Sequence, residues 1–385
     1  MVVSQTTPQA QRYISRTLMS SMATRRPRIE TSFDIRKSNS NPLLKKLDHR
    51  DWLAPNEAMK IFKTLKNADQ VLVALKKISS RNDYKPNESL FSLIVDRLAR
   101  ERRFDDIEDV LQTVKYTKIK VSDSFFSNLI KIYINVANHL EKAIQVLFRM
   151  SEFHCCPTIE TFNLVLNMLV CGKHYEIVHE VYLSAAKLGV VVDTCCFNIL
   201  IKGLCNCGKM DAAFSLLCEI PKQGCMPNTK TYSTLMHGLC KQNRVDEAIK
   251  LWHEMEEKDI CPDTITFNIL ISGLCERGRI HEGMEFMDKM KLSGCYPNSA
   301  TYQAILYGLL ESKSFLDAKD FMNKMLSEGG SPSSLSYKLL IHGLCSSGLQ
   351  ADVDLVLKKM LDNGFIPQVK TWKKMIMACV ENHGS

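Results

Sequence analysis

The chain has 385 residues and a formal net charge of +8, with 50 Lys and Arg residues against 42 Asp and Glu residues. Length alone would allow two or three domains, and no run of about 18 apolar residues suggests a membrane span. The small charge excess does not by itself indicate nucleic-acid binding, so such a function must depend on where the charges lie.

Residues 1–29 differ from the rest in composition, because they contain five Arg but no Lys and no acidic residue. Residues 10–22 can form a short helix with Arg12 and Arg16 on one side and Ile14 and Leu18 on another. This pattern predicts an organellar transit peptide, mitochondrial rather than chloroplast, with residues 30–52 as a linker. A disordered basic tail is the alternative.

A period of 35 residues dominates the remaining chain. Aromatic residues recur at this step, at Phe162, Phe197, Tyr232, Phe267, Tyr302, Tyr337 and Trp372. Such a period is typical of a solenoid, in which one supersecondary unit stacks on its neighbours.

One repeat, residues 229–263, shows what the unit is. Its first half carries apolar residues at helical spacing, namely Tyr232, Leu235, Met236, Leu239 and Cys240. A second apolar series follows at Val245, Ala248, Ile249, Trp252 and Met255. Each repeat is therefore predicted to be a helix–turn–helix hairpin in an all-α solenoid.

The period divides residues 53–385 into about nine repeats and a last helix. The predicted boundaries are 53–87, which is divergent, 88–122, 123–158, 159–193, 194–228, 229–263, 264–298, 299–333 and 334–368, with a closing helix at 369–385. The repeat 123–158 is one residue long, and the extra residue is expected near residues 137–140.

Glycine and cysteine also recur in register. The glycines lie inside the first helices, where an exposed Gly would cost about 1 kcal/mol relative to Ala, so they predict close helix–helix approach. They are Gly203, Gly238, Gly273, Gly308 and Gly343. Cys205, Cys240, Cys275 and Cys345 share an apolar position, and there is no Cys-x-x-Cys. We therefore expect core cysteines in a reducing compartment, with no metal site and no cofactor.

The repeat resembles the pentatricopeptide repeat family, in its class of pure repeats. The resemblance rests on the length of 35, on Thr161-Phe162-Asn163 and Thr266-Phe267-Asn268, on Gly-Leu-Cys, and on a closing Pro-Asp or Pro-Asn. It covers residues 88–385 well and 53–87 weakly. It implies a right-handed superhelix that reads one base of single-stranded RNA per repeat.

The family reads each base with two residues, the one after the aromatic and the last of the repeat. The resemblance implies uracil for Asn163 with Asp193, a pyrimidine leaning to cytosine for Asn198 with Asn228 and for Asn268 with Asn298, and guanine for Ser233 with Asp263. The implied core is 5′-U-Y-G-Y-3′, where Y is a pyrimidine. Alternatively, Asn after the aromatic could cap its helix. We favour base reading because capping would not also require a polar last residue.

In this family the second residue of a repeat clamps the base, and a lysine after Gly-Leu-Cys lies near the phosphates. Ile265 and Leu335 fit the clamp, whereas Glu160, Cys195 and Lys230 depart from it. Lys241 fits the phosphate position, whereas Glu276 and Glu311 stand at the equivalent places.

Three functions follow as hypotheses. The first is selective binding of organellar single-stranded RNA for stabilisation, processing, splicing or translation, with no catalysis and no small-molecule substrate. The second is a protein-interaction solenoid that binds other organellar proteins or a ribosome. The third, an enzyme, is not expected, since His174-Tyr175-Glu176 matches only half of a zinc-deaminase motif.

Overall fold

The computed structural model describes residues 44, 47, 53–81, 83–366, 369, 372 and 373. The predicted transit peptide, most of the predicted linker and most of the closing helix lie outside the described residues. The described chain is all-α, as predicted, and contains no strand. It falls into two compact units, Met1–Gly203 and Leu204–Ser385.

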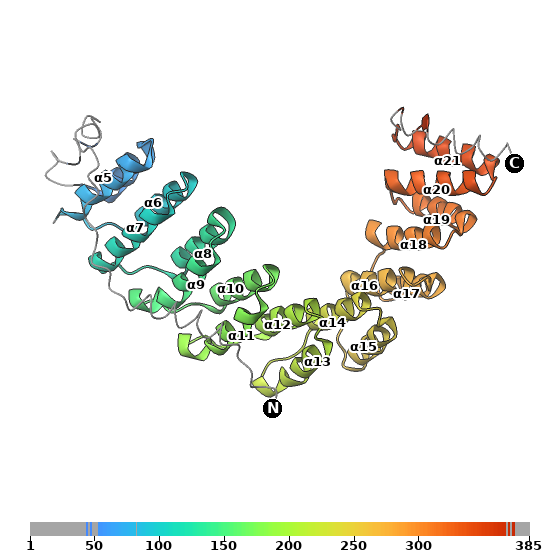
Figure 1. Ribbon diagram of the computed structural model, residues 1–385, viewed down its shortest axis with the longest axis horizontal. Helices are drawn as coiled ribbons and strands as arrows, with labels where there is room; N and C mark the ends of the chain where they lie inside the picture. The colour runs from blue at the N-terminus through green and yellow to red at the C-terminus, as the bar shows by residue number, and fades with distance from the viewer. Residues whose placement is uncertain are drawn as a thin grey trace. The chain divides into compact units, whose positions relative to one another are not determined.

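Nine consecutive pairs of helices lie along the described part of the chain, and each pair falls within one predicted repeat (Figure 1). In the first compact unit the α-helices are α4 (Pro55–Thr64), α5 (Ala68–Ser79), α6 (Glu88–Arg100), α7 (Phe104–Thr117), α8 (Asp123–Ile132), α9 (Leu140–Arg149), α10 (Ile159–Cys171), α11 (Tyr175–Leu183) and the start of α12 (Thr194–Asn206). The second compact unit continues with α13 (Met210–Glu219), α14 (Thr229–Lys241), α15 (Val245–Glu257), α16 (Thr264–Cys275), α17 (Ile280–Leu292), α18 (Ser299–Glu311), α19 (Phe315–Ser327), α20 (Ser334–Ser346) and α21 (Gln350–Asp362). Short 3-10 turns η2 (Met150–Phe153), η3 (Ala186–Leu188) and η4 (Pro221–Gln223) follow α9, α11 and α13.

The recurring aromatics from Phe162 to Tyr337 are core residues, whereas Trp372 is half-buried. Phe162, Tyr232 and Phe267 have no exposed surface, and Tyr302 is 5% exposed. A buried tyrosine needs a partner for its hydroxyl, and Tyr232 finds one in Lys258, whose ammonium donates to Oη at 3.1 Å. The rings therefore hold each hairpin together and are not available as surfaces on which bases stack.

The recurring glycines allow neighbouring first helices to approach closely, as predicted. A Cβ atom at Gly273 would lie 2.6 Å from Sγ of Cys240, and one at Gly308 would lie 2.9 Å from Cβ of Cys275. The cysteines are thus the small apolar residues against which the next backbone packs. Burial raises the pKa of Cys240 to about 11 and of Cys275 to about 12, so both thiols stay neutral.

The extra residue of repeat 123–158 lies in a π-helical turn, η1 (Tyr133–Ala137), between α8 and α9. The backbone N–H of His139 donates to the carbonyl of Tyr133 at 2.9 Å, and Asn138 has a left-handed φ of 53°. A π turn takes up one more residue than an α turn. The prediction of an insertion near residues 137–140 is confirmed within a few residues.

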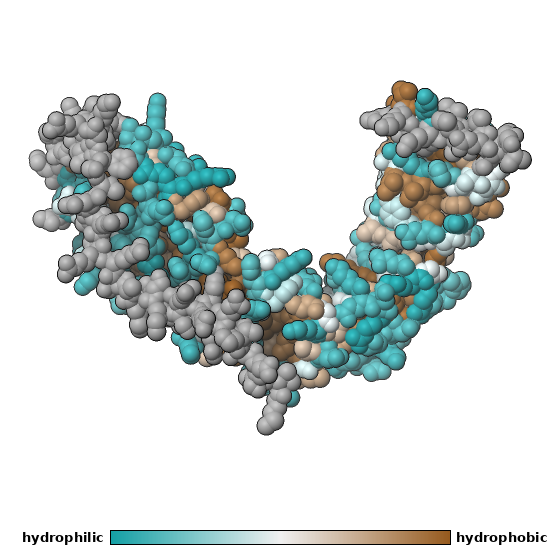
Figure 2. Space-filling view, in the orientation of Figure 1, coloured by the Kyte–Doolittle hydropathy of each residue, from teal (hydrophilic) through white to brown (hydrophobic). Residues whose placement is uncertain are grey.

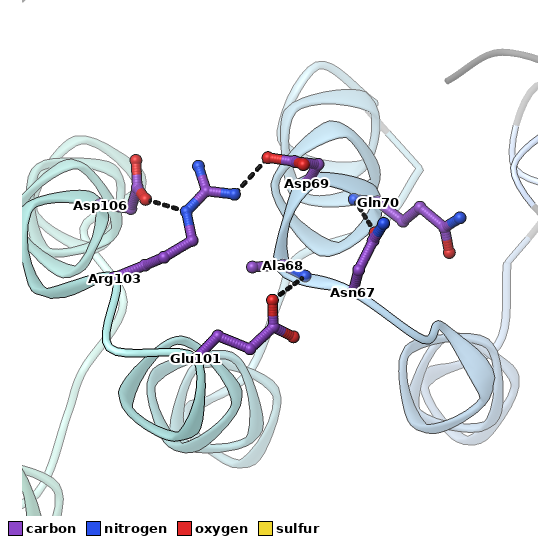
Figure 3. Close-up of polar contacts among 7 residues, drawn as sticks. All are labelled: Asn67, Ala68, Asp69, Gln70, Glu101, Arg103 and Asp106. Carbon is purple, nitrogen blue, oxygen red and sulfur yellow. Dashed lines mark hydrogen bonds and ion pairs between the residues drawn. The ribbon is translucent and has the colours of Figure 1, made fainter. Parts of the chain in front are cut away.

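Polar side chains join the first two hairpins (Figure 3). Arg103, just before α7, donates to Asp106 of its own helix at 2.5 Å and also to Asp69 of α5 in the preceding repeat. Glu101 accepts the backbone N–H of Ala68 at 3.0 Å, at the N-terminus of α5. The link between these repeats is therefore partly electrostatic.

Candidate nucleic-acid interface

The predicted base readers fall into two structural classes. The residues after the aromatics lie one turn inside the first helices, and Asn163, Asn198 and Ser233 are buried at 9%, 8% and 5% exposure. The last residues of the repeats precede those helices in extended conformation, with φ of −108° for Asp263 and −111° for Asn298. In a pair that lies within one compact unit, such as Asn268 with Asn298, the two members thus meet from a helix and from a loop.

The last residue of a repeat also caps the next helix. Asn228 accepts the backbone N–H of Thr231 at 3.1 Å, Asp263 that of Thr266 at 2.7 Å, and Asn298 that of Thr301 at 3.2 Å. Side chains at this position commonly satisfy the free N–H groups of a helix N-terminus. Capping in these repeats therefore falls on the last residue of the preceding repeat, and not on the Asn after the aromatic, which was the alternative to base reading. The polar last residue has a structural cause of its own.

Asn163 and Asp193 contact each other. Nδ2 of Asn163 donates to Oδ1 of Asp193 at 3.2 Å, and the same oxygen accepts the backbone N–H of Cys196 at 2.8 Å. A carboxylate only accepts hydrogen bonds, so it fixes the amide with Oδ1 turned away. That Oδ1 is buried and has no hydrogen-bond partner among the described residues.

Asn268 and Asn298 contact each other in the same way but with a different result. Nδ2 of Asn268 donates to Oδ1 of Asn298 at 3.3 Å. Oδ1 of Asn268 accepts the hydroxyl of Thr301, from the following repeat, at 2.6 Å. The acceptor that is unsatisfied in Asn163 is therefore occupied in Asn268.

Ser233 and Asp263 differ again, because no hydrogen bond joins them in the described structure. The Ser233 hydroxyl donates to the carbonyl of Lys230 at 3.1 Å, within its own helix. Oδ1 of Asp263 accepts both the N–H and the hydroxyl of Thr266 at 2.7 Å. Asp263 is exposed, so the rest of its carboxylate faces solvent.

Asn198 and Asn228 belong to different compact units. Asn198 is buried in α12, and Asn228 is the exposed cap of α14. The threonine that follows this cap completes a capping box, since the hydroxyl of Thr231 accepts the N–H of Asn228 at 3.1 Å.

Comparison with known sequences identifies the repeat. Models of the pentatricopeptide repeat family match residues 109–173, 192–241, 230–276, 262–311 and 335–365. The chain belongs to the pentatricopeptide repeat family. A mitochondrial pentatricopeptide repeat-containing protein of Arabidopsis thaliana is 45% identical over 181 residues, which are 47% of this chain and 45% of that protein.

Two further comparisons are more distant. The small ribosomal subunit protein mS79 of Arabidopsis thaliana is 30% identical over 146 residues, or 38% of this chain and 37% of that protein. The crystal structure of maize PPR10 matches with a TM-score of 0.42 and 16% identity, over 87% of this chain and 57% of that chain. The chain thus aligns with less than half the length of the mitochondrial relative and of mS79.

The residues predicted to clamp the base or to lie near the phosphates are open to solvent in this pentatricopeptide repeat chain. Ile265, the second residue of α16, is 58% exposed, and Leu335 is 52% exposed. Lys230 and Lys241 are also exposed, near the start and at the end of α14. Exposed lysines can neutralise phosphates, whereas Glu276 and Glu311 at equivalent positions would repel them.

Neither a metal-ligand cluster nor a membrane-spanning helix is present among the described residues of this chain. No three His, Cys, Asp or Glu side chains among them gather as metal ligands, and none of their helices is long and apolar enough to cross a membrane. His174, predicted to belong to an ordinary repeat, precedes α11 at a hairpin turn.

Sequence reasoning missed the third residue of each repeat. Thr161, Thr231, Thr266, Thr301 and Ser336 are all at most 1% exposed, and their hydroxyls take part in the bonds around the reading pairs. The signal was present in the sequence, because a hydroxyl residue directly precedes the aromatic in most repeats. The exceptions among the repeats that carry the aromatic are Leu90, Phe125 and Cys196, in repeats 88–122, 123–158 and 194–228.

Proposed function

We propose that this chain binds single-stranded RNA in mitochondria, selects its sequence one base per repeat, and performs no chemistry on it. Binding would protect or remodel the transcript for stabilisation, processing, splicing or translation. The proposed RNA carries the core 5′-U-Y-G-Y-3′, read by residues 159–298.

The observation that carries this proposal is the contrast in hydrogen-bonding character between two reading pairs. Asn163 with Asp193 has a buried acceptor without a donor. Asn268 with Asn298 has that acceptor occupied and keeps amide N–H groups as donors. Uracil carries an N–H on its Watson–Crick edge, whereas cytosine carries an acceptor nitrogen there. The first pair therefore suits uracil and the second suits cytosine, which agrees with the bases implied by the family.

The pair of Ser233 and Asp263 suits guanine. Ser233 is engaged by its own helix, and the exposed carboxylate of Asp263 is joined to no reading partner. Guanine offers two adjacent N–H groups, which a carboxylate can accept together.

Binding assays with short single-stranded RNAs test this function. We expect the chain to bind RNA with U-C-G-C at its centre at least tenfold (about 1.4 kcal/mol) more tightly than a scrambled RNA. The logarithm of the affinity should fall with the logarithm of salt concentration by about 0.7 per phosphate contact. Equal affinity for both RNAs would contradict sequence selection.

The change Asn163→Thr is a sharper test of the same function. It removes the amide that holds Asp193 and frees the carboxylate. Preference at the first base should shift from uracil toward guanine, as measured by competition between two RNAs that differ only there. Asn167→Thr, in the same helix but outside the reading pair, should leave the preference unchanged.

Mitochondrial location is proposed from two observations. Residues 1–29 have the composition of a transit peptide, and the 45% identical relative is described as mitochondrial. Residues 1–29 fused to a fluorescent protein should direct it to mitochondria, and accumulation in chloroplasts would favour the alternative.

A second candidate function is a protein-binding solenoid. Leu335 and Leu339 are 52% and 43% exposed, one turn apart on α20, and apolar surface is visible in that region (Figure 2). One similar protein is a ribosomal subunit protein. Partners that survive RNase treatment of the purified organellar complex would favour this function, whereas partners lost on digestion favour RNA binding.

A further inference from the structure

We infer that the third residue of the following repeat sets the base preference of an Asn reader, by occupying or leaving open its amide oxygen. This inference rests on the proposed RNA function. It assigns a positioning role to Thr301 for the pair Asn268–Asn298, and to Cys196 for the pair Asn163–Asp193. Neither residue is itself a base reader.

The groups around Thr301 determine which bond its hydroxyl accepts and which it donates. Its Oγ1 accepts the backbone N–H of Asn298 at 3.1 Å, and its only proton is directed to Oδ1 of Asn268 at 2.6 Å. The longer 3.3 Å approach to Oδ1 of Asn298 is the weaker alternative for that proton. The hydroxyl thus holds Asn268 with its oxygen engaged and its NH₂ group on the side of Asn298.

Cys196 occupies the same position after the repeat of Asn163. The amide of Asn163 is oriented by Asp193 rather than by a hydroxyl, and its Oδ1 is left without a partner. Cys196 itself is fully buried, and its backbone N–H donates to Asp193 at 2.8 Å. At the position where Thr301 has a hydroxyl, which is a strong donor, Cys196 therefore has a thiol, which is a weak one.

A buried acceptor without a donor is rare, because leaving it unsatisfied costs free energy. At Asn163 the missing donor is the one that uracil can supply through its N3–H. The oxygen is shielded from water in the free protein, so the side chain rotates slightly to meet the base, which the broad χ2 of Asn permits. At Asn268 the hydroxyl of Thr301 already supplies the donor, and the remaining amide N–H suits the acceptor nitrogen of cytosine.

Two reciprocal variants test this inference in the full chain. Cys196→Thr supplies the missing hydroxyl, and Thr301→Val removes the existing one with little change in shape. Each variant is titrated with four short RNAs that carry U or C at the first or the fourth base of U-C-G-C.

We expect Cys196→Thr to lower the preference for U over C at the first base by about threefold to tenfold, without altering the fourth base. Thr301→Val should lower the preference for C over U at the fourth base by a similar factor and spare the first. Thr301→Ser should behave as the wild type because it keeps the hydroxyl.

The matched control is Thr266→Val. This residue has the same repeat position, but its hydroxyl donates to Asp263 at 2.7 Å and not to the Ser233 reader. It should weaken folding as much as Thr301→Val does, with no change at the fourth base. Cys196→Ser repeats the first test if Cys196→Thr does not fold.

The outcomes are distinguishable. If the wild type distinguishes the RNAs but both variants keep its base ratios, the inference is overturned and the RNA function stands. If the wild type binds all RNAs equally, both fail. A measurement without RNA adds a second readout, because satisfying Oδ1 of Asn163 should raise the thermal midpoint of Cys196→Thr, and a lowered midpoint in the folded variant counts against the inference.

Discussion

Neighbouring repeats are held together differently in residues 53–158 and in residues 194–345. In the later repeats a glycine stands at the tenth position, and at Gly238, Gly273 and Gly308 it lets one first helix pack against the cysteine of the preceding one. In the earlier repeats larger residues stand at that position, namely Phe62, Arg97 and Ile132. There, charged side chains form hydrogen bonds from one repeat to the next: Arg103 bonds to Asp69, Glu101 to the N–H of Ala68, and Asp123 to the hydroxyl of Thr161.

The difference shows that one repeat architecture can be stabilised by two kinds of contact. The stability of a solenoid is roughly the sum of its repeats and their nearest-neighbour interfaces. Close packing is sensitive to added volume and insensitive to salt, whereas polar links depend on single acceptors and, at the surface, on ionic strength. The two regions should therefore respond to different substitutions.

Added side-chain volume at a glycine contact should cause the largest loss of stability. We expect Gly273→Val to lower the free energy of unfolding by about 3 kcal/mol, because its side chain would overlap Sγ of Cys240. Urea unfolding of the full chain, followed by hydrogen exchange of α14 and α16, would measure this loss.

Two controls isolate the cause of that loss. Cys240→Ala in the Gly273→Val background should recover part of it, since it removes the overlapping atom. Ile132→Val, at the equivalent position of the earlier region, should cost only about 1 kcal/mol. A loss below 1 kcal/mol for Gly273→Val would mean that the glycine contact is not tight.

Periodicity predicted the hairpins, the buried aromatics, the tight glycine contacts and the inserted residue, because all of these follow from one repeated face. It did not predict that the last residue of a repeat caps the next helix, nor that Thr301 donates to Asn268. The cap is a local bond over three residues, which the capping preference of Asn and Asp was enough to predict. The bond from Thr301 to Asn268 joins residues of two repeats, so it depends on how those repeats stack. A period identifies the residues on a face, but the partner across an interface is set by side-chain geometry.

Removal of the Asp123 carboxylate, an acceptor shared by two threonines in the earlier region, should cause an intermediate loss of stability. Asp123 accepts the N–H and the hydroxyl of Thr158 at 2.9 Å, and the hydroxyl of buried Thr161 at 2.8 Å. We expect Asp123→Ala to destabilise this region by about 2 kcal/mol, because the Thr161 hydroxyl would be left buried without its acceptor.

Thr229, the first residue of its repeat as Asp123 is of its own, is the matched position in the later region. Thr229 makes one exposed bond, from its hydroxyl to the carbonyl of Cys261 at 3.0 Å, so Thr229→Ala should cost only about 0.5 kcal/mol. Asp123→Asn should lie between the two, since it keeps an acceptor but loses the charge. Equal losses for Asp123→Ala and Thr229→Ala would remove the distinction between the regions.

Removal of a surface ion pair should cause the smallest loss of stability, and such pairs occur in both regions. Arg103 joins Asp69 to Asp106 (Figure 3), and Arg279 joins Asp246 to Glu282 at 2.6 Å each. The arginines are partly exposed, so each substitution to Met should cost about 0.5–1 kcal/mol, and the cost should shrink at high salt. If polar links matter more where glycine packing is absent, Arg103→Met should cost more than Arg279→Met in urea unfolding at low salt. Equal costs would show that the ion pairs contribute independently of the packing beneath them, and would confine the difference between the regions to glycine and to the buried acceptors.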